Sequence, residues 1–188
     1  MRVEKLLVVV GITVLVLGCV PSLHPLYTEK DVTFEPTLVG VWSEKDKTDT
    51  WTFKKSGDNA YELIMTEDGV PGKFEVHLVR LGELLFLDLY PEEPDIANNL
   101  YKAHLVPAHT FLGIQIDKEK GVVRLAIIKP DWLEEAIDSK KVTIAHERLG
   151  DGDESTIVLT ASTKALQEFV VKHAAEAFGE PAELHRRK

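Results

Sequence analysis

The feature that most constrains the fold is an alternation of apolar and polar side chains that begins after Gly40. Trp51 and Phe53 occupy every second position, and the residues between them are polar. The turn residues 56–59 follow, and Tyr61 then starts the same alternation again. Consecutive side chains of a β-strand point to opposite faces. The pattern therefore predicts strands with one apolar face each, joined by tight turns.

Short segments of this kind recur along the chain at regular spacing. Further predicted strands cover residues 74–78, 84–89, 103–106, 110–116, 122–128, 142–148 and 156–160. About eight to ten short strands with tight turns predict a mainly β, antiparallel barrel, with a two-sheet sandwich as the alternative. The side chains expected inside are large: Trp51, Phe53, Tyr61, Phe74 and Phe86.

Two helices are predicted among these strands. A short one starts at Pro130 and runs to Ser139, and a longer C-terminal one runs from about Ser162 to Phe178. The second carries one apolar stripe, formed by Leu166, Phe169, Val170, His173, Ala174 and Ala177. This stripe predicts a helix packed against the barrel, ended by the residues 179–181.

The N-terminus has the features of a secretory signal peptide: basic residues followed by an uncharged apolar run, 6–17. That run is shorter than the ~20 residues needed to span a membrane. It leads into Val16-Leu17-Gly18-Cys19, which contains the only cysteine of the chain. This motif resembles the lipobox of bacterial lipoproteins. The resemblance implies cleavage before Cys19 and lipidation of its thiol; an uncleaved anchor and an ordinary signal peptide are the alternatives.

The expected organisation is therefore a lipoprotein signal peptide (1–18), a lipidated tether (19–36) and one barrel domain (37–188). We expect part of the tether, from about Leu26, to be ordered. A lipoprotein of this kind is exported and attached to a membrane through its N-terminal lipid. Val20 after the cysteine resembles the outer-membrane address of enterobacteria, which places the domain in the periplasm; the alternative is the outer face of the cell membrane.

Gly40-Val41-Trp42 opens the first strand of the barrel domain. This Gly-x-Trp resembles the start of lipocalins and the wider calycin group. The resemblance implies a lipocalin-like barrel whose tryptophan packs across the closed end, covered by a later arginine, for which Arg124 and Arg148 are candidates. The stretch Leu23 to Tyr27 is similar to one found in uncharacterised bacterial lipoproteins, which implies no function.

Motifs that would indicate an enzyme are missing from the sequence. It contains no nucleophile elbow, no H-E-x-x-H, no cysteine-rich zinc spacing and no glycine-rich phosphate loop. His104 and His109 flank a bend at Pro107, but a metal site needs at least a third ligand. The sequence therefore predicts no catalytic residue, metal or cofactor. A formal net charge of −9 argues against a nucleic-acid partner.

Two polar residues fall on predicted apolar faces, Asp88 after Phe86 and His146 after Ile144. If they face inward, they either make a core hydrogen bond or contact a ligand. Two functions follow. The first is a lipid-anchored binding domain for an apolar or amphipathic small molecule. The alternative is a non-enzymatic envelope interaction or assembly module with a filled barrel. Its candidate surfaces are the loop 91–99 and the C-terminal helix, and exposure of Tyr101 or Trp132 would count as support.

Overall fold

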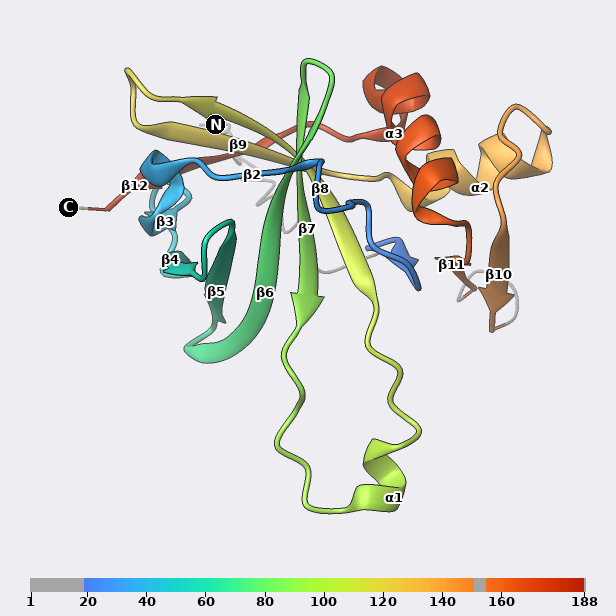
Figure 1. Ribbon diagram of the computed structural model, residues 1–188, viewed down its shortest axis with the longest axis horizontal. Coiled ribbons are helices and arrows are strands. Elements are labelled where there is room, and N and C mark those ends of the chain that lie inside the picture. Colours follow the sequence, from blue (N-terminus) through green and yellow to red (C-terminus); the bar gives the residue numbers. More distant parts are fainter. Residues whose placement is uncertain (1–18, 151–154, 188) are drawn as a thin grey trace, which may run out of the picture.

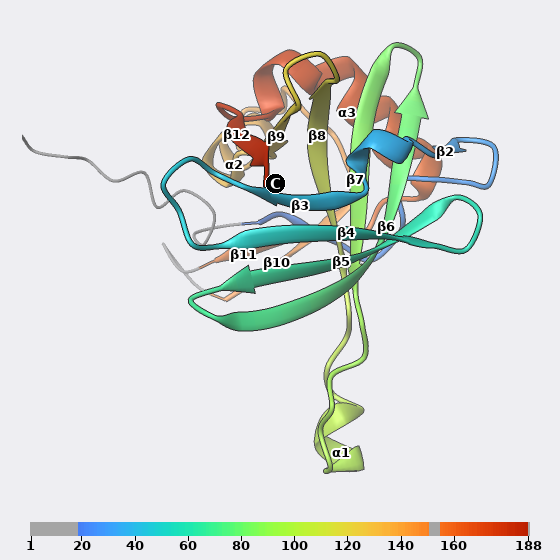
Figure 2. The ribbon, with the colours of Figure 1, turned by 90° about the vertical axis from the view of Figure 1, so that its left-hand side faces the viewer.

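The structure is a computed structural model that describes residues 19–150 and 155–187. It is mainly β, with a closed antiparallel barrel of eight strands, additional strands outside the barrel and a C-terminal helix (Figures 1 and 2). The predicted antiparallel barrel is confirmed, and the sandwich is excluded. The predicted signal peptide, 1–18, lies outside the described residues.

Seven barrel strands follow one another as a meander, and an eighth comes from the C-terminus. They are β3 (Gly40–Ser43), β4 (Thr50–Ser56), β5 (Ala60–Glu67), β6 (Val70–Leu81), β7 (Leu84–Pro91), β8 (His109–Asp117), β9 (Val122–Ile127) and β12 (Ala182–Arg186). Each strand pairs with the next up to β9, and β12 pairs with both β9 and β3. The ring is closed by this C-terminal strand.

The sequence analysis missed β12, since it ended the last predicted helix at residues 179–181 and assigned nothing beyond. The strand is short, but Leu184 alternates with exposed neighbours and is only 2% exposed. Its side chain belongs to the barrel core, and its backbone pairs with Val123 of β9. A single inward side chain is too weak a period-two signal to be recognised in a sequence.

Arg186 of β12 covers the tryptophan of the Gly-x-Trp motif. Its guanidinium lies 4.9 Å from the ring centroid of Trp42, at a distance typical of a cation–π contact. Gly40 has a positive φ of 146°, and a Cβ there would lie 2.6 Å from an Arg186 nitrogen. The prediction that Arg124 or Arg148 covers this tryptophan is wrong. Arg124 pairs with Glu183, and Arg148 pairs with acidic residues of a helix.

The barrel interior is filled by its own side chains. Of the five large side chains expected there, Trp51, Phe53 and Tyr61 are buried in the interior, and Phe74 is partly buried at its margin. The buried members are Leu38, Trp42, Trp51, Phe53, Tyr61, Leu63, Val76, Leu78, Leu87, Leu89, Leu112, Ile114, Val123, Leu125 and Leu184. A barrel of eight strands is just wide enough to be filled in this way.

A second apolar core lies outside the barrel, between its wall and the helices. The helices are α2 (Pro130–Asp138) and α3 (Thr163–Ala177), and three short strands extend the sheet beside them: β1 (Pro21–Ser22), β10 (His146–Leu149) and β11 (Thr156–Leu159). Phe86 packs into this outer core, opposite to its predicted orientation. The stripe of α3 faces the same core, as predicted, through Leu166, Phe169 and Val170.

The segment after Cys19 is ordered earlier than expected. β1 pairs with β8 and β11, Leu26 is fully buried, and β2 (Val32–Thr33) pairs with β6. A short 3-10 helix, η1 (Pro36–Leu38), then leads into β3. These residues form part of the folded domain, and all strands and both cores lie within residues 20–187.

Two predicted strands differ in the structure. Residues 103–106 follow the short helix α1 (Asn99–Lys102) and pair with no strand, because this part of the chain projects away from the barrel. Asn98 begins the helix by accepting a hydrogen bond from the Tyr101 N–H at 2.9 Å. The strand predicted over residues 142–148 is reduced to β10.

We predict that Leu184→Ala destabilises the domain by about 2–5 kcal/mol, because it removes a buried side chain from the strand that closes the barrel. Urea unfolding followed by tryptophan fluorescence measures this change. The matched control is Leu149→Ala, whose side chain is exposed and should cost less than about 0.5 kcal/mol. Equal effects of the two substitutions would contradict the role of β12.

Candidate functional site

Asp88 lies on the outer wall of the barrel and is fully buried by the N-terminal segment. Its neighbours Leu87 and Leu89 point into the barrel, so Asp88 faces the opposite side together with Phe86, and the inward orientation considered for Asp88 is not found. One carboxylate oxygen accepts the Leu26 N–H at 2.6 Å, and the other lies 2.7 Å from Nδ1 of His109. Both oxygens are therefore engaged in internal bonds.

Aromatic rings cover this pair. Tyr27 stacks on His77, which stands opposite Asp88 in β6, with 4.2 Å between ring centroids, and Tyr90 lies 4.6 Å from His109. Burial, with the nearby Asp88 charge, raises the pKa of Tyr27 to about 12. Burial also lowers the pKa of His77, against the opposing effect of Glu75. The hydrogen bonds of Asp88 and the rings packed around them attach the N-terminal segment to β7 and β8.

The second predicted ligand residue, His146, lies far from Asp88 in the strand order. It starts β10, which β11, β1 and β8 separate from β7. Its Nδ1 is 2.8 Å from the backbone oxygen of Ile144. The structure does not bring the two residues together, and His146 contributes to no cavity wall described below.

Cys19 is exposed and directly precedes the buried Val20. A lipid on this residue would therefore start beside the domain, without a long flexible spacer. No helix in the described part of the chain is long and apolar enough to cross a membrane.

The two histidines around Pro107 do not meet. His104 is exposed beyond α1, whereas His109 is bonded to Asp88. Within residues 19–150 and 155–187, no group of three or more His, Cys, Asp or Glu side chains is placed to hold a metal ion.

The most prominent feature outside the barrel is the arm, residues 92–108, which joins β7 to β8 and projects from one end of both strands (Figures 1 and 2). Its end carries apolar side chains that are open to solvent. Leu100 is 75% exposed, Tyr101 59%, Leu105 42% and Val106 73%. They are four of the eight large apolar side chains that are exposed among the described residues.

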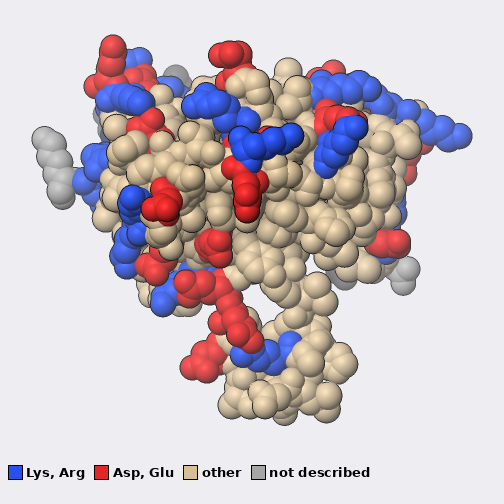
Figure 3. All heavy atoms as spheres, viewed as in Figure 1, with Lys and Arg blue, Asp and Glu red and all other residues tan. Residues whose placement is uncertain are grey.

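The arm is ordered by its own bonds. The Lys102 ammonium reaches across it to Glu93 at 2.6 Å, and the N–H groups of His104 and Leu105 bond back to carbonyls of the helix. Acidic side chains (Glu92, Glu93 and Asp95) flank the leg that leaves β7, whereas the end carries one Lys or Arg, Lys102, which is paired with Glu93 (Figure 3). An ordered apolar projection of this kind loses little conformational entropy when it binds.

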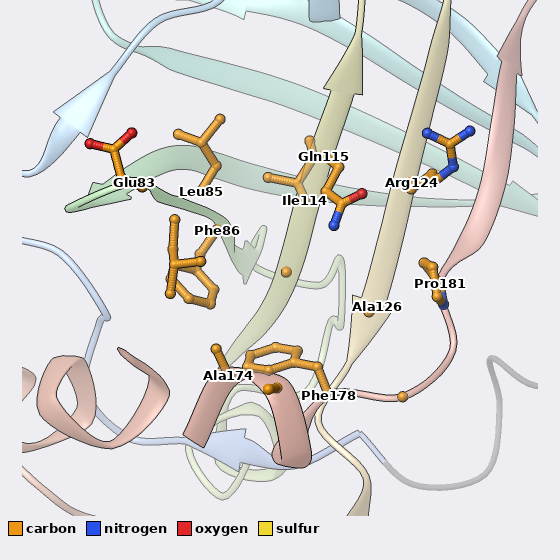
Figure 4. Close-up of a pocket in the computed structure, with 14 residues that line it drawn as sticks. Glu83, Leu85, Phe86, Ile114, Gln115, Arg124, Ala126, Ala174, Phe178 and Pro181 are labelled. Carbon is orange, nitrogen blue, oxygen red and sulfur yellow. The ribbon is translucent and has the colours of Figure 1, made fainter. Parts of the chain in front are cut away.

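A groove of about 450 Å³ opens on the outer wall, at the other end of β7 and β8 (Figure 4). Its floor is the surface of β8 and β9 at Gly113 and Ala126, and the end of α3 with Phe178 forms one side. The sequence analysis missed this site, because four separate segments build it. Tyr101 of the arm was named from the sequence as a candidate exposed anchor and is 59% exposed. Leu105 and Val106 were not recognised as part of the arm, because they were included in a predicted strand.

No protein-family model, curated protein or solved structure matches this chain. The candidate sites therefore depend on their own geometry.

We predict that Asp88→Ala destabilises the domain by about 2–4 kcal/mol, because it leaves the buried Leu26 N–H and the His109 ring without their acceptor. Asp88→Asn keeps the size and one acceptor oxygen, and should cost about half as much. Urea unfolding measures both. Limited proteolysis should also show earlier cleavage within residues 20–33 of the alanine variant; unchanged cleavage there would contradict the anchoring role of Asp88.

Proposed function

We propose that this chain is a lipid-anchored lipoprotein of the cell envelope that acts as a non-enzymatic interaction module and binds a partner protein through the arm. The observation that carries the proposal is the apolar end of the arm, where four large side chains are exposed together. Fifteen buried apolar side chains pack inside the barrel, which favours a binding site on its outside. Exposed aromatic and aliphatic side chains on an ordered projection are typical of binding anchors.

The charges of the arm indicate the chemistry of the partner. Acidic groups border the apolar end on one side, and the whole chain has a net charge of −9. An anionic lipid surface or a nucleic acid would be repelled. The complementary partner is a protein with an apolar pocket and basic side chains at its rim.

The proposed anchor is the lipid on Cys19. The lipobox motif supports it, and the exposure of Cys19 leaves room for the modification. The domain would be attached to the outer membrane and face the periplasm, or otherwise stand on the outer face of the cell membrane. Its order from Val20 onward would keep it close to that surface.

A second candidate function is the binding of an apolar or amphipathic small molecule. The observation that favours it is the groove, whose volume is within the range of ligand pockets, about 300–1,000 Å³. Such a ligand would lie on the outer wall of the barrel. Lipocalin-like binding would instead require a ligand inside the barrel.

We predict that Leu100→Ser combined with Val106→Ser abolishes partner binding by the arm. In the native bacterium, a photo-crosslinking amino acid at Tyr101 should yield one dominant crosslinked protein, and the double substitution should reduce its yield about tenfold or more, because two anchors are lost.

The matched control is Val70→Ser with Leu149→Ser, which changes a valine and a leucine that are also exposed but lie outside the arm, and it should leave the yield unchanged. If both double variants reduce crosslinking alike, or if Tyr101 yields no crosslink, the arm is not the binding surface.

We also predict that Cys19 is the N-terminal residue of the mature chain and carries acyl groups. Mass spectrometry of the N-terminal peptide should show a modified Cys19 in the wild type, and residues 1–18 should remain attached in Cys19→Ser, because the thiol is the site of modification. An unmodified Cys19 in the wild type would refute the anchor.

A further inference from the structure

The groove has an apolar floor and side that are uncovered in the folded domain. Gly113 on β8 and Ala126 on β9 are the small residues that create the depression, and Ala174 and Phe178 line it from the end of α3. The Phe178 ring lies so close to Gly113 that a Cβ there would be 3.4 Å from it. Larger residues at these positions would fill the groove.

The polar groups of the groove lie along its other side. Figure 4 shows Glu83 at one end, Gln115 in the middle and Arg124 at the opposite end. Arg124 is half-buried and contacts Glu183 at 2.8 Å through one terminal nitrogen. A guanidinium has five N–H donors, so a single contact leaves donors for a second acceptor.

We propose that the groove binds a single-chain amphiphile with an anionic head group. The head lies at Arg124 and Gln115, and the apolar body lies over Gly113 and Ala126 against Phe178. The inference deepens the second candidate function, binding of an amphipathic small molecule, and does not depend on the arm.

Size and charge both support this occupant. A volume of about 450 Å³ suits one small molecule and is too little for a folded partner. An anion placed at Arg124 gains charge-assisted hydrogen bonds and stays at the far end from Glu83. A cationic head at this end would be repelled by Arg124, and the carboxylate that lines the groove, Glu83, lies at the opposite end.

The test uses the chain from Val20 to Lys188, which contains both cores and every described strand. Three probes share one chain length: decanoate, decanol and decyltrimethylammonium. Calorimetric or NMR titration should show the tightest binding for decanoate. The net negative charge of the domain disfavours decanoate relative to the cationic probe. Tighter binding of decanoate would therefore have to come from a local positive site.

Two substitutions fill the groove, Ala126→Leu and Ala174→Leu, and each should weaken decanoate binding about tenfold or more. Ala60→Leu is the matched control, a half-buried alanine on β5 outside the groove, and should have no effect. If neither groove substitution weakens decanoate binding, the amphiphile does not bind in the groove. The second candidate function, which rests on the groove, is then refuted as well.

The head-group assignment is tested separately. Arg124→Gln should weaken decanoate binding about three- to tenfold and leave decanol unchanged, because only the anion uses the guanidinium. Glu183→Gln should strengthen decanoate binding about threefold by releasing Arg124 from its partner. If Ala126→Leu excludes all three probes alike and Arg124→Gln changes none, the groove binds amphiphiles but the anionic class is overturned.

Discussion

Closure of the barrel by the C-terminal strand is the constraint on which the rest of the structure depends. β12 lies between β9 and β3, so the last residues of the chain complete a ring that the preceding meander leaves open. The same strand places Arg186 over Trp42 and Leu184 in the core. Once closed, a barrel of eight strands holding tryptophan, phenylalanine and tyrosine side chains has little interior space. We therefore expect any binding site for a ligand or a partner on the outer surface.

The outer surface is organised by the Asp88 cluster. Asp88 joins β7 to His109 of β8 and to the backbone of the N-terminal segment, and Gln167 of α3 bonds the Leu26 carbonyl at 2.9 Å. A buried carboxylate is costly unless its oxygens are satisfied, and here both are. The bonds hold four parts of the chain together at the base of the arm: β7, β8, the N-terminal segment and α3. The position of the arm relative to Cys19 is thus fixed by the fold and not by a flexible linker.

The sequence predicted those features that depend on repeated local patterns. Alternation from Thr50 to Leu89 and the stripe of α3 specify elements many residues long, and these were predicted correctly. β12 was missed and a strand was wrongly predicted in the arm, for opposite reasons. β12 has only one inward side chain, whereas Leu105 and Val106 look like a strand but find no neighbouring strand to pair with. Asp88 was recognised as unusual, but its orientation depends on whether one or both faces of β7 are buried, and the outer core buries the second face.

The arm and the groove occupy opposite ends of one strand pair. β7 and β8 pair from Phe86 with Gly113, beside the groove, to Leu89 with Thr110, beside the base of the arm. Asp88 and His109 reinforce the ladder between them, and the inner face of the pair is locked in the filled core. Interiors packed in this way resist continuous deformation. A ligand changes a distant site only if it binds two conformations of the connecting elements differently. A strand pair whose β7 residues 86–89 are all buried is expected to keep one conformation. We therefore expect the two proposed sites to act independently, the arm toward a protein and the groove toward a small amphiphile.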